Sequence, residues 1–326
     1  MSVYIHGGLR SPIGVLNGQY KHMRPEMLGA QLIDELINRH SILQVDGLFC
    51  GNAVGTGGNI GRLMGLMCNL PNSVPAITVD MQCASALMNI EIAYAHIVSG
   101  IMDSAIAGGI ESSSLQPERV YASGDDRKGT YKVAQFTPQD QSPLAMLEGA
   151  ERTIHKHNVT KEDLYLHIIG SHQRASAALD NPYLQSYIMP ITIDGKRCID
   201  ECIRPTMNEK LLSRMKPLLG ADSITNAGNA CLTHDGAAFV YLSNKKGPFK
   251  IHSVKPWAGN PQFSPEGALE STEGILKRTG LTMDDIDVVE WNEAFAIIDV
   301  LFDKTYPNHI GKYNMFGGAL AYGHPY

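Results

Sequence analysis

Residues 84–100 form the stretch that most restricts how this chain can fold. Their sequence, ASALMNIEIAYAHIVSG, holds 11 apolar residues among 17, and Glu91 is the only formally charged one. A helix that is apolar on nearly all sides belongs in the interior of a protein, between other layers of structure. The sequence therefore predicts a buried helix here.

Strand and helix patterns alternate around this stretch. Short runs rich in β-branched residues, bounded by turn residues, are typical of strands, and apolar residues at helical spacing are typical of helices. We expect strands within residues 3–8, 45–54, 74–80 and 103–110, and further helices within residues 27–40 and 61–70. Such a βαβαβ order implies a largely parallel sheet covered by helices.

The character of the sequence changes between residues 115 and 219. This stretch is more charged and richer in loops, as is typical of an insertion carried on a sheet scaffold. A second α/β portion follows it. We expect helices within residues 145–157, 163–179 and 266–280, and strands within residues 223–242 and 285–292. A chain of 326 residues is long enough for two domains, or for one large unit with an insertion.

Charge and composition argue against several partners. The formal net charge is −6 and no long run of Lys or Arg is present, so nucleic acid is not expected as a partner. The sequence shows neither a signal-peptide pattern nor an apolar run long enough to span a bilayer, so we expect a cytoplasmic protein with no membrane partner. Its six cysteines are then expected to be free thiols. Cys198 and Cys202 lack a second pair at ligand spacing, so no metal site is expected.

Cys83 stands directly before the apolar stretch. The start of a helix presents unpaired N–H groups and the positive end of the helix dipole, and this setting lowers the pKa of a nearby thiol. Cys83 is therefore a candidate nucleophile toward carbonyl carbons. The alternative is that a small, weakly polar cysteine is simply buried there. Helix position alone leaves both interpretations open.

A set of motifs favours the nucleophile through a family resemblance. They are CAS at 83–85, AGGIESSS at 107–114, AGNACLTHDGAA at 227–238, NEAFA at 292–296 and GHP at 323–325. In order, spacing and local context these motifs resemble those of the thiolase family. The likeness begins at RSPIG (10–14) and includes SHQRA (171–175) and DECIRP (200–205). The chain looks like the acetyl-CoA acyltransferases found in bacteria.

The resemblance implies acyl transfer, either the cleavage of 3-ketoacyl-CoA with CoA or the reverse Claisen condensation. Cys83 matches the nucleophile that takes the acyl group from an acyl-CoA as a thioester. His324 matches the histidine that deprotonates this thiol and then helps to hold the thioester oxygen of the second CoA substrate. Asn292 matches the residue that fixes a water in the same oxyanion hole. Residue chemistry agrees, because a cysteine needs a basic partner and a developing oxyanion needs fixed donors.

Contacts with CoA are implied in the same way. Arg204 matches an arginine that packs on the adenine part of CoA, and Cys231 stands where the family usually has a serine near the pantetheine. Met146 matches a methionine of the pantetheine tunnel, and Ala294 and Phe295 line the same region in relatives. Coenzyme A and acyl-CoA enter here as substrates, and no tightly bound cofactor is expected.

The resemblance also implies the fold class, which is α/β. Thiolases have a five-layer αβαβα fold of two related halves with an inserted loop domain, and we expect the second half to be incomplete here. Residues 1–114 and 222–245 are expected to form the first half, 115–221 the loop domain that binds CoA, and 246–326 the second half. Relatives pair through their first halves, so a homodimer, or a tetramer, is expected.

The sequence departs from the family pattern at its end. It stops at GHPY, whereas relatives continue into a second buried helix and a CxG motif whose cysteine moves the α-proton of acetyl-CoA. From this we expect a C-terminally truncated thiolase with impaired carbon–carbon bond formation, because general acid–base catalysis contributes about 10²- to 10⁴-fold. The alternative is a catalytically inactive subunit of thiolase fold that binds CoA or a partner. A ketoacyl synthase would share the fold, but NEAFA followed by GHP favours a thiolase.

Overall fold

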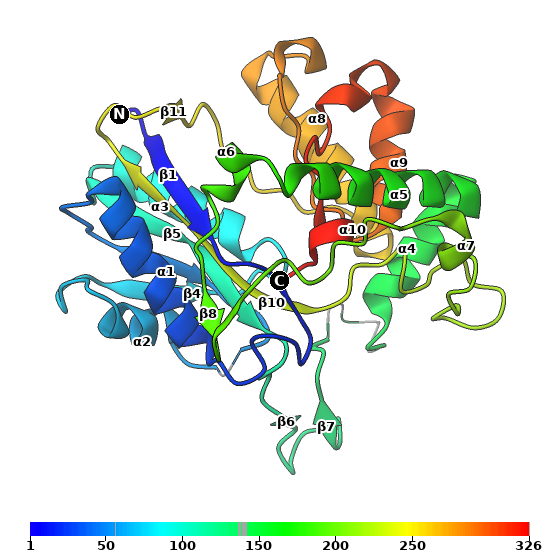
Figure 1. Ribbon diagram of the computed structural model, residues 1–326, viewed down its shortest axis with the longest axis horizontal. Coiled ribbons are helices and arrows are strands. Elements are labelled where there is room, and N and C mark those ends of the chain that lie inside the picture. The colour runs from blue at the N-terminus through cyan, green and yellow to red at the C-terminus, as the bar shows by residue number, and fades with distance from the viewer. Residues whose placement is uncertain (56, 136–137, 139–141, 326) are drawn as a thin grey trace.

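The computed structural model describes residues 1–55, 57–135, 138 and 142–325. Its first half is built on one seven-stranded sheet (Figure 1). The strands are β1 (Tyr4–Arg10), β2 (Gly14–Val15), β3 (Leu48–Gly51), β4 (Ala76–Val79), β5 (Ser104–Ser112), β10 (His234–Ser243) and β11 (Phe249–Lys250). Their order across the sheet is β11-β1-β10-β5-β3-β4, and β2 pairs with β10.

Helices cover both faces of this sheet, because its central strand is apolar on both sides. All residues of β5 are buried. Ile106 belongs to a core shared with α1 (Pro25–His40) and α2 (Ile60–Met67), whereas Ala107 belongs to a core shared with α3 (Ser85–Val98). Successive residues of a strand point to opposite faces, so these helices lie on opposite sides of the sheet. The alternation of strands and helices expected for the start of the chain is confirmed.

The sheet is mixed, and the expectation of a largely parallel sheet is wrong. β3 runs parallel to β4 and to β5. β10, in contrast, is antiparallel to both β5 and β1. A short helical crossover returns the chain in the parallel sense, but β10 arrives after the long excursion of residues 115–221 and can enter from either end.

Residues 115–221 form a loop-rich region with two longer helices, α4 (Ala145–Lys156) and α5 (Lys161–Ala178). The start of α5 is fixed by a capping box, in which the Thr160 hydroxyl accepts from the Asp163 N–H and the Asp163 carboxylate accepts from the Thr160 N–H. The short elements are β6 (Arg119–Val120), β7 (Thr130–Tyr131), α6 (Pro182–Gln185), β8 (Thr192–Ile193), β9 (Lys196–Arg197) and α7 (Glu209–Leu212). The β6–β7 hairpin projects from the body of the molecule (Figure 1).

The second half is mainly helical in the described residues. Its helices are η1 (Pro261–Glu266), α8 (Gly267–Thr279), η2 (Met283–Asp285), α9 (Ala296–Thr305), η3 (Pro307–Lys312) and α10 (Ala319–Tyr322). The strand expected within residues 285–292 is wrong as a strand, since this segment makes only an isolated bridge between Val289 and Tyr313. A ladder requires a longer paired neighbour, and the described chain supplies only the short segment around Tyr313.

Helix α3 is open along one side, contrary to the expectation of burial all round. Ser85, Asn89, Ala93 and Ile97 are buried, and their spacing of four residues marks a single helix face. On another side, Leu87 is 72% exposed. The described segments cover the face of α3 that meets the sheet, while Leu87, Met88 and Ile90 line a cavity.

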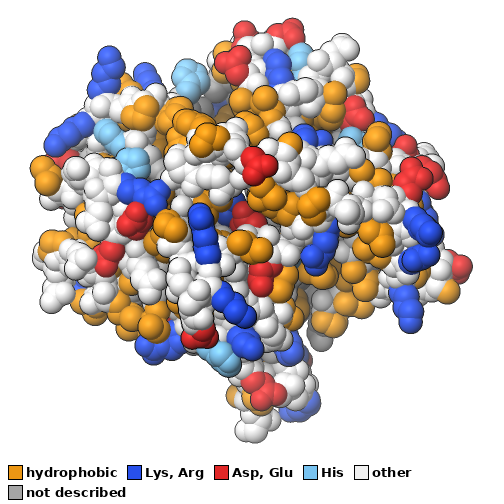
Figure 2. Space-filling model, viewed as in Figure 1, with side chains coloured by type: hydrophobic (Ala, Val, Ile, Leu, Met, Phe, Trp, Pro, Cys, Tyr) orange, Lys and Arg blue, Asp and Glu red, His pale blue; other side chains and the backbone are white. Residues whose placement is uncertain are grey.

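Apolar, acidic and basic side chains are interspersed over the face seen in Figure 2. The Lys and Arg side chains do not gather into one patch there. Within the described parts of the chain, no helix combines the length and the apolar character needed to cross a bilayer.

We expect the substitution Gly51→Ala to destabilise the first turn of α3. A Cβ on Gly51 would lie 2.8 Å from the Ser85 Cβ and 2.9 Å from the Ala86 backbone nitrogen, so the helix must shift. Overpacking of this kind costs about 1–3 kcal/mol of unfolding free energy, measurable by urea denaturation. Gly124→Ala is the control, because a Cβ there meets no atom within 4 Å. Equal unfolding free energies for the two variants would contradict this packing account.

Candidate active site

Cys83 lies in a tight turn between β4 and α3. Its neighbour Gln82 has a φ of 51°, in the left-handed region that residues other than glycine rarely adopt. Ser85 holds the turn, since its hydroxyl donates to the Gln82 carbonyl at 2.5 Å and accepts from the Met81 N–H at 2.8 Å. Such strained residues persist only where the surroundings enforce them, and they cluster at functional sites. The turn sets Cys83 immediately before the helix.

Burial dominates the pKa of Cys83. It raises the pKa of the thiol to about 11, and a hydrogen bond with the residue's own backbone opposes the rise only in part. The expectation that the helix start lowers this pKa is wrong, because the cost of placing a thiolate in apolar surroundings exceeds the gain from the dipole. The thiol is therefore protonated near neutral pH and needs a base to become a nucleophile.

Cys83 lines an open cavity of about 710 Å³ between α3 and the second half of the chain. Apolar side chains such as Leu87, Ile275 and Trp257 make up much of its wall. The cavity brings together the predicted site residues Cys83, Met146, Asn292, Ala294 and Phe295. The other three predicted residues, Arg204, Cys231 and His324, are not part of this lining.

His324 lies directly beside Asn292. The Nδ2 atom of Asn292 is 3.5 Å from the Nε2 atom of His324. The backbone N–H of His324 donates to Nδ1 of His234 at 2.9 Å. Gly323 makes this approach possible, since its φ is 104° and a Cβ would lie 2.7 Å from the His234 ring. Sequence reasoning missed His234, although it stands within the AGNACLTHDGAA motif.

Both histidines are neutral at pH 7. Burial lowers the pKa of His324 to about 4, and the neighbouring His234 lowers it further. Burial also lowers the pKa of His234 itself. A neutral imidazole can accept a proton from a thiol, which is the role expected of His324.

Backbone hydrogen bonds join the NEAFA segment to residues 229–231, which precede β10. The Cys231 N–H donates to the Ala294 carbonyl at 2.8 Å, and the Ala296 N–H donates to the Asn229 carbonyl at 2.9 Å. The structure thus places Cys231 next to the cavity wall, with its thiol donating to the Ala319 carbonyl at 3.1 Å.

Arg204 lies on the surface, apart from this cluster. Its side chain is exposed, and its backbone N–H donates to Nδ1 of His172 at 3.2 Å. Burial lowers the pKa of His172 to about 4, and the Arg204 charge adds to that lowering. The structure therefore does not bring Arg204 to the Cys83 cavity.

Glu293 is a buried carboxylate that ties Asn292 to the segment leading to His324. It is 0% exposed. Its oxygens accept from the Ser171 hydroxyl at 2.7 Å, the Asn314 amide at 2.9 Å and the Leu320 N–H at 3.2 Å. The guanidinium of Arg174 lies 3.9 Å away. Sequence reasoning missed this role, although Glu293 is part of NEAFA.

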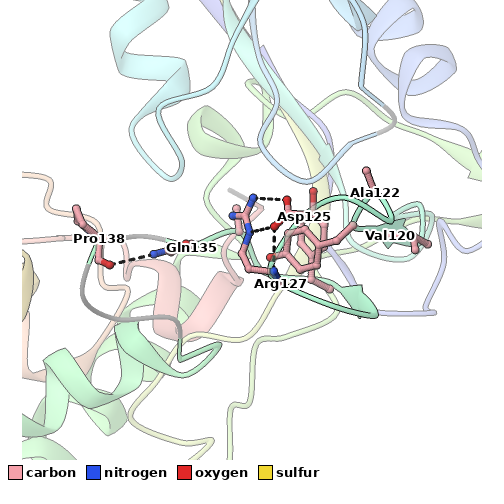
Figure 3. Close-up of a pocket in the computed structure, with 9 residues that line it drawn as sticks. Val120, Ala122, Asp125, Arg127, Gln135 and Pro138 are labelled. Atoms are coloured by element: carbon pink, nitrogen blue, oxygen red, sulfur yellow. Dashed lines mark hydrogen bonds and ion pairs between the residues drawn. The ribbon is translucent and has the colours of Figure 1, made fainter.

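A second cavity, of about 600 Å³, lies at the β6–β7 hairpin (Figure 3). Tyr121 and Tyr131 stack there with ring centroids 4.3 Å apart, and the Arg127 guanidinium lies over the Tyr121 ring. Arg127 also donates two hydrogen bonds to the Asp125 carboxylate, at 3.0 and 2.8 Å. None of the predicted site residues lines this cavity. Of these two cavities, the Cys83 cavity is therefore the one that predicted site residues line.

The fold and the site together define a class of protein. A thiol at a helix start, sharing an apolar cavity with an amide that has a histidine beside it, suits acyl transfer through a thioester. The family model "Thiolase, N-terminal domain" matches residues 3–246, and "Thiolase, C-terminal domain" matches residues 249–326. This chain belongs to the thiolase family.

Relatives and a solved structure agree with this assignment. The protein named "Putative acetyl-CoA C-acetyltransferase VraB" from Staphylococcus epidermidis is 31% identical, over 97% of this chain and 86% of its own length. Its namesake from Staphylococcus haemolyticus is also 31% identical, over 97% of this chain and 87% of its own length. The crystal structure of the Bacillus anthracis acetyl-CoA acetyltransferase superposes with a TM-score of 0.91 at 24% identity, covering 99% of this chain and 88% of that one. The thiolase-like fold class expected from the motifs is confirmed.

Proposed function

We propose that this protein transfers acyl groups between CoA thioesters and that Cys83 carries the acyl group as a covalent thioester. The observation that carries the proposal is the shared cavity, which Cys83, Met146 and Asn292 all line. The names of the relatives support acetyl-CoA as one substrate.

The proposed first step is attack by Cys83 on the thioester carbonyl of an acyl-CoA. His324 takes the thiol proton as the sulfur–carbon bond forms. The C–S bond to CoA then breaks, and His324 returns the proton to the leaving sulfur, so that CoA departs as a thiol. When a second acyl-CoA binds, His324 and a water fixed by Asn292 hold its thioester oxygen. The acyl group leaves Cys83 either to a CoA thiol or to the α-carbon of a second acyl-CoA. We propose further that Arg204 and Cys231 contact CoA, and that the protein is a homodimer in the cytoplasm, as the family resemblance implies.

Incubation with acetyl-CoA tests the first step. We expect intact-protein mass spectrometry to show one added acetyl group, mapped by peptide analysis to Cys83, and no adduct in Cys83→Ala. Cys68→Ser is the matched control, since Cys68 is buried in the first-half core, where its thiol donates to the Gly65 carbonyl, and it should acylate like the parent protein. A folded parent protein that stays unmodified at Cys83 would refute the proposal.

A catalytically inactive, CoA-binding thiolase is the second candidate. The raised pKa of Cys83, about 11, favours it, because a neutral thiol is inert unless a base activates it. This candidate predicts saturable CoA binding in calorimetry without any acetyl adduct, so the same sample distinguishes the two.

A further inference from the structure

His234 stands where the sheet meets the C-terminal segment. It is the first residue of β10 and is only 6% exposed. Its backbone pairs with Val15 of β2, and its carbonyl accepts from the Ser113 hydroxyl at 3.1 Å. The next residue, Asp235, is wholly buried, and its carboxylate accepts from the Ser114 N–H at 2.9 Å. The His234 backbone is therefore fixed by the sheet and by the segment that follows β5.

The C-terminal segment lies beside this point of β10 (Figure 1), where Thr233 and His324 form an isolated parallel bridge. The His234 ring faces the same segment. Its Nδ1 atom accepts from the backbone N–H of His324 at 2.9 Å. Gly323 packs against the ring so closely that a Cβ there would lie 2.7 Å from it. The ring thus joins the fixed sheet to the residue proposed as the base.

This hydrogen bond requires a neutral His234. An imidazole nitrogen accepts a hydrogen bond only when it carries no proton, so the ring proton must lie on Nε2. Burial supports this form, since it lowers the pKa of His234, although a hydrogen bond with the Leu232 backbone and the charge of Asp235 act in the opposite direction. His234 and Asn292 both face His324.

We propose that His234 is a positioning residue, which holds the His324 backbone so that the His324 imidazole stays buried beside Asn292. His234 acts through His324 and touches no reacting atom. The inference rests on the proposed function, because His324 is the base of the proposed acylation step. It gives the Nδ1 atom of His234 a specific task, beyond filling space in the core.

Two substitutions of nearly equal size separate the acceptor from the space that the ring fills. The amide oxygen of His234→Asn is as many bonds from Cβ as Nδ1 is, so it can accept from the His324 N–H. His234→Leu has the same branched shape but no acceptor. Both remove the imidazole and its charge, and only His234→Leu removes the hydrogen bond. His167→Leu is the control, since it replaces another buried histidine, whose Nε2 lies 3.5 Å from the Asp303 carboxylate.

Acylation of Cys83 by acetyl-CoA at pH 7 is the first measurement. We expect His234→Leu to react about 10²-fold more slowly than the parent protein, because a misplacement of about 1 Å in a catalytic group has an effect of that size. His234→Asn and His167→Leu should stay close to the parent rate. In a His324→Ala background, adding His234→Leu should change the rate little, because His234 acts through His324. An equal loss in both backgrounds would mean that the substitution disturbs the fold in general, and it would overturn the proposal.

The titration of His324 is the second measurement, and it needs no acyl transfer. The Cε1–H signal of His324 is assigned in proton–carbon NMR spectra by its absence from His324→Ala. Burial lowers the pKa of His324 to about 4, so this signal should shift little between pH 5 and 8 in the parent protein and in His234→Asn. In His234→Leu the ring should meet water, and the signal should titrate near the ordinary pKa of about 6.5.

The two measurements separate this inference from the proposed function. If Cys83 acylates, but His234→Asn and His234→Leu react at the same rate, the positioning role is overturned and the proposed function stands. If Cys83 of the parent protein never acylates, the proposed function fails and the titration decides. A difference between the two variants then retains the positioning role, and equal titration overturns it.

A further variant guards against a failure to fold. If circular dichroism shows that His234→Leu is unfolded, His234→Gln takes its place in both measurements. Its amide lies one bond further from the backbone and does not reproduce the Nδ1 acceptor, so we expect the same slow acylation and raised His324 pKa.

Discussion

Replacing His324 with alanine is expected to slow the acylation of Cys83 about 10²- to 10⁴-fold at pH 7, the range that a general base contributes. The reason is the protonation state of the Cys83 thiol. Burial raises the pKa of Cys83 to about 11, so almost no thiolate forms spontaneously at pH 7. His324 is neutral at that pH, because burial lowers its pKa to about 4, and it can accept the thiol proton.

The pH dependence provides the decisive measurement for His324. The parent rate should change little between pH 6 and 8, since the imidazole is already neutral above its lowered pKa. The rate of His324→Ala should rise about tenfold for each pH unit toward 11, because the thiolate must then form by simple ionisation. The defect of the variant therefore shrinks as the pH rises, which a merely misfolded protein would not show.

Rates are to be measured by rapid quenching with acetyl-CoA and intact-mass detection. His22→Ala, which removes an exposed histidine far along the chain from the site, is the control. A His324→Ala variant that acylates at the parent rate at pH 7 would show that another group activates Cys83.

The largest stability effect is expected from Glu293→Ala. Its carboxylate is wholly buried and accepts three hydrogen bonds, from Ser171, Asn314 and Leu320. Removing it leaves these donors without an acceptor, and the charge of Arg174 loses its neighbour. Breaking a buried charged network costs about 3–5 kcal/mol of unfolding free energy, measurable by urea denaturation.

The Glu293→Ala substitution should also disturb the position of His324 in the candidate active site. Leu320 lies in α10, which leads directly to Gly323 and His324, so loss of the Glu293 contact frees the segment that positions the histidine. Glu293→Gln is the matched variant, because its amide oxygen can still accept one of these bonds, and we expect a smaller loss than for Glu293→Ala. If the unfolding free energy of Glu293→Ala lies within about 1 kcal/mol of that of the parent protein, these hydrogen bonds stabilise the fold less than their burial implies.

Much of the fold follows from local sequence patterns. The helical spacing of residues 27–40 and 85–98 and the β-branched run at 74–80 predict α1, α3 and β4, because the periodicity of side chains along an element is a local property. The direction of β10 could not be found in this way. It depends on the end of β5 from which the chain enters the sheet after the insertion, and no local pattern records that choice.

The residues of the candidate site also fall into two groups, those that sequence motifs identify and those that only the structure reveals. Cys83 and Asn292 stand out in the sequence through their motifs, and the structure brings both to one cavity. His234 and Glu293 were missed, since their importance arises from neighbours more than twenty residues away in the sequence. Arg204, matched by resemblance alone, lies on the surface outside the cavity.

The sequence by itself determined the thiolase class, the order of the main elements and the cysteine at the start of α3, because motifs and periodicities are properties of short segments. Only the tertiary structure decided the direction of the Cys83 pKa, the open side of α3 and the pairing of Asn292 with His324. The physical reason is that desolvation and side-chain contact depend on segments distant in the chain. A helix start lowers a thiol pKa in isolation, but the surrounding protein sets the final balance.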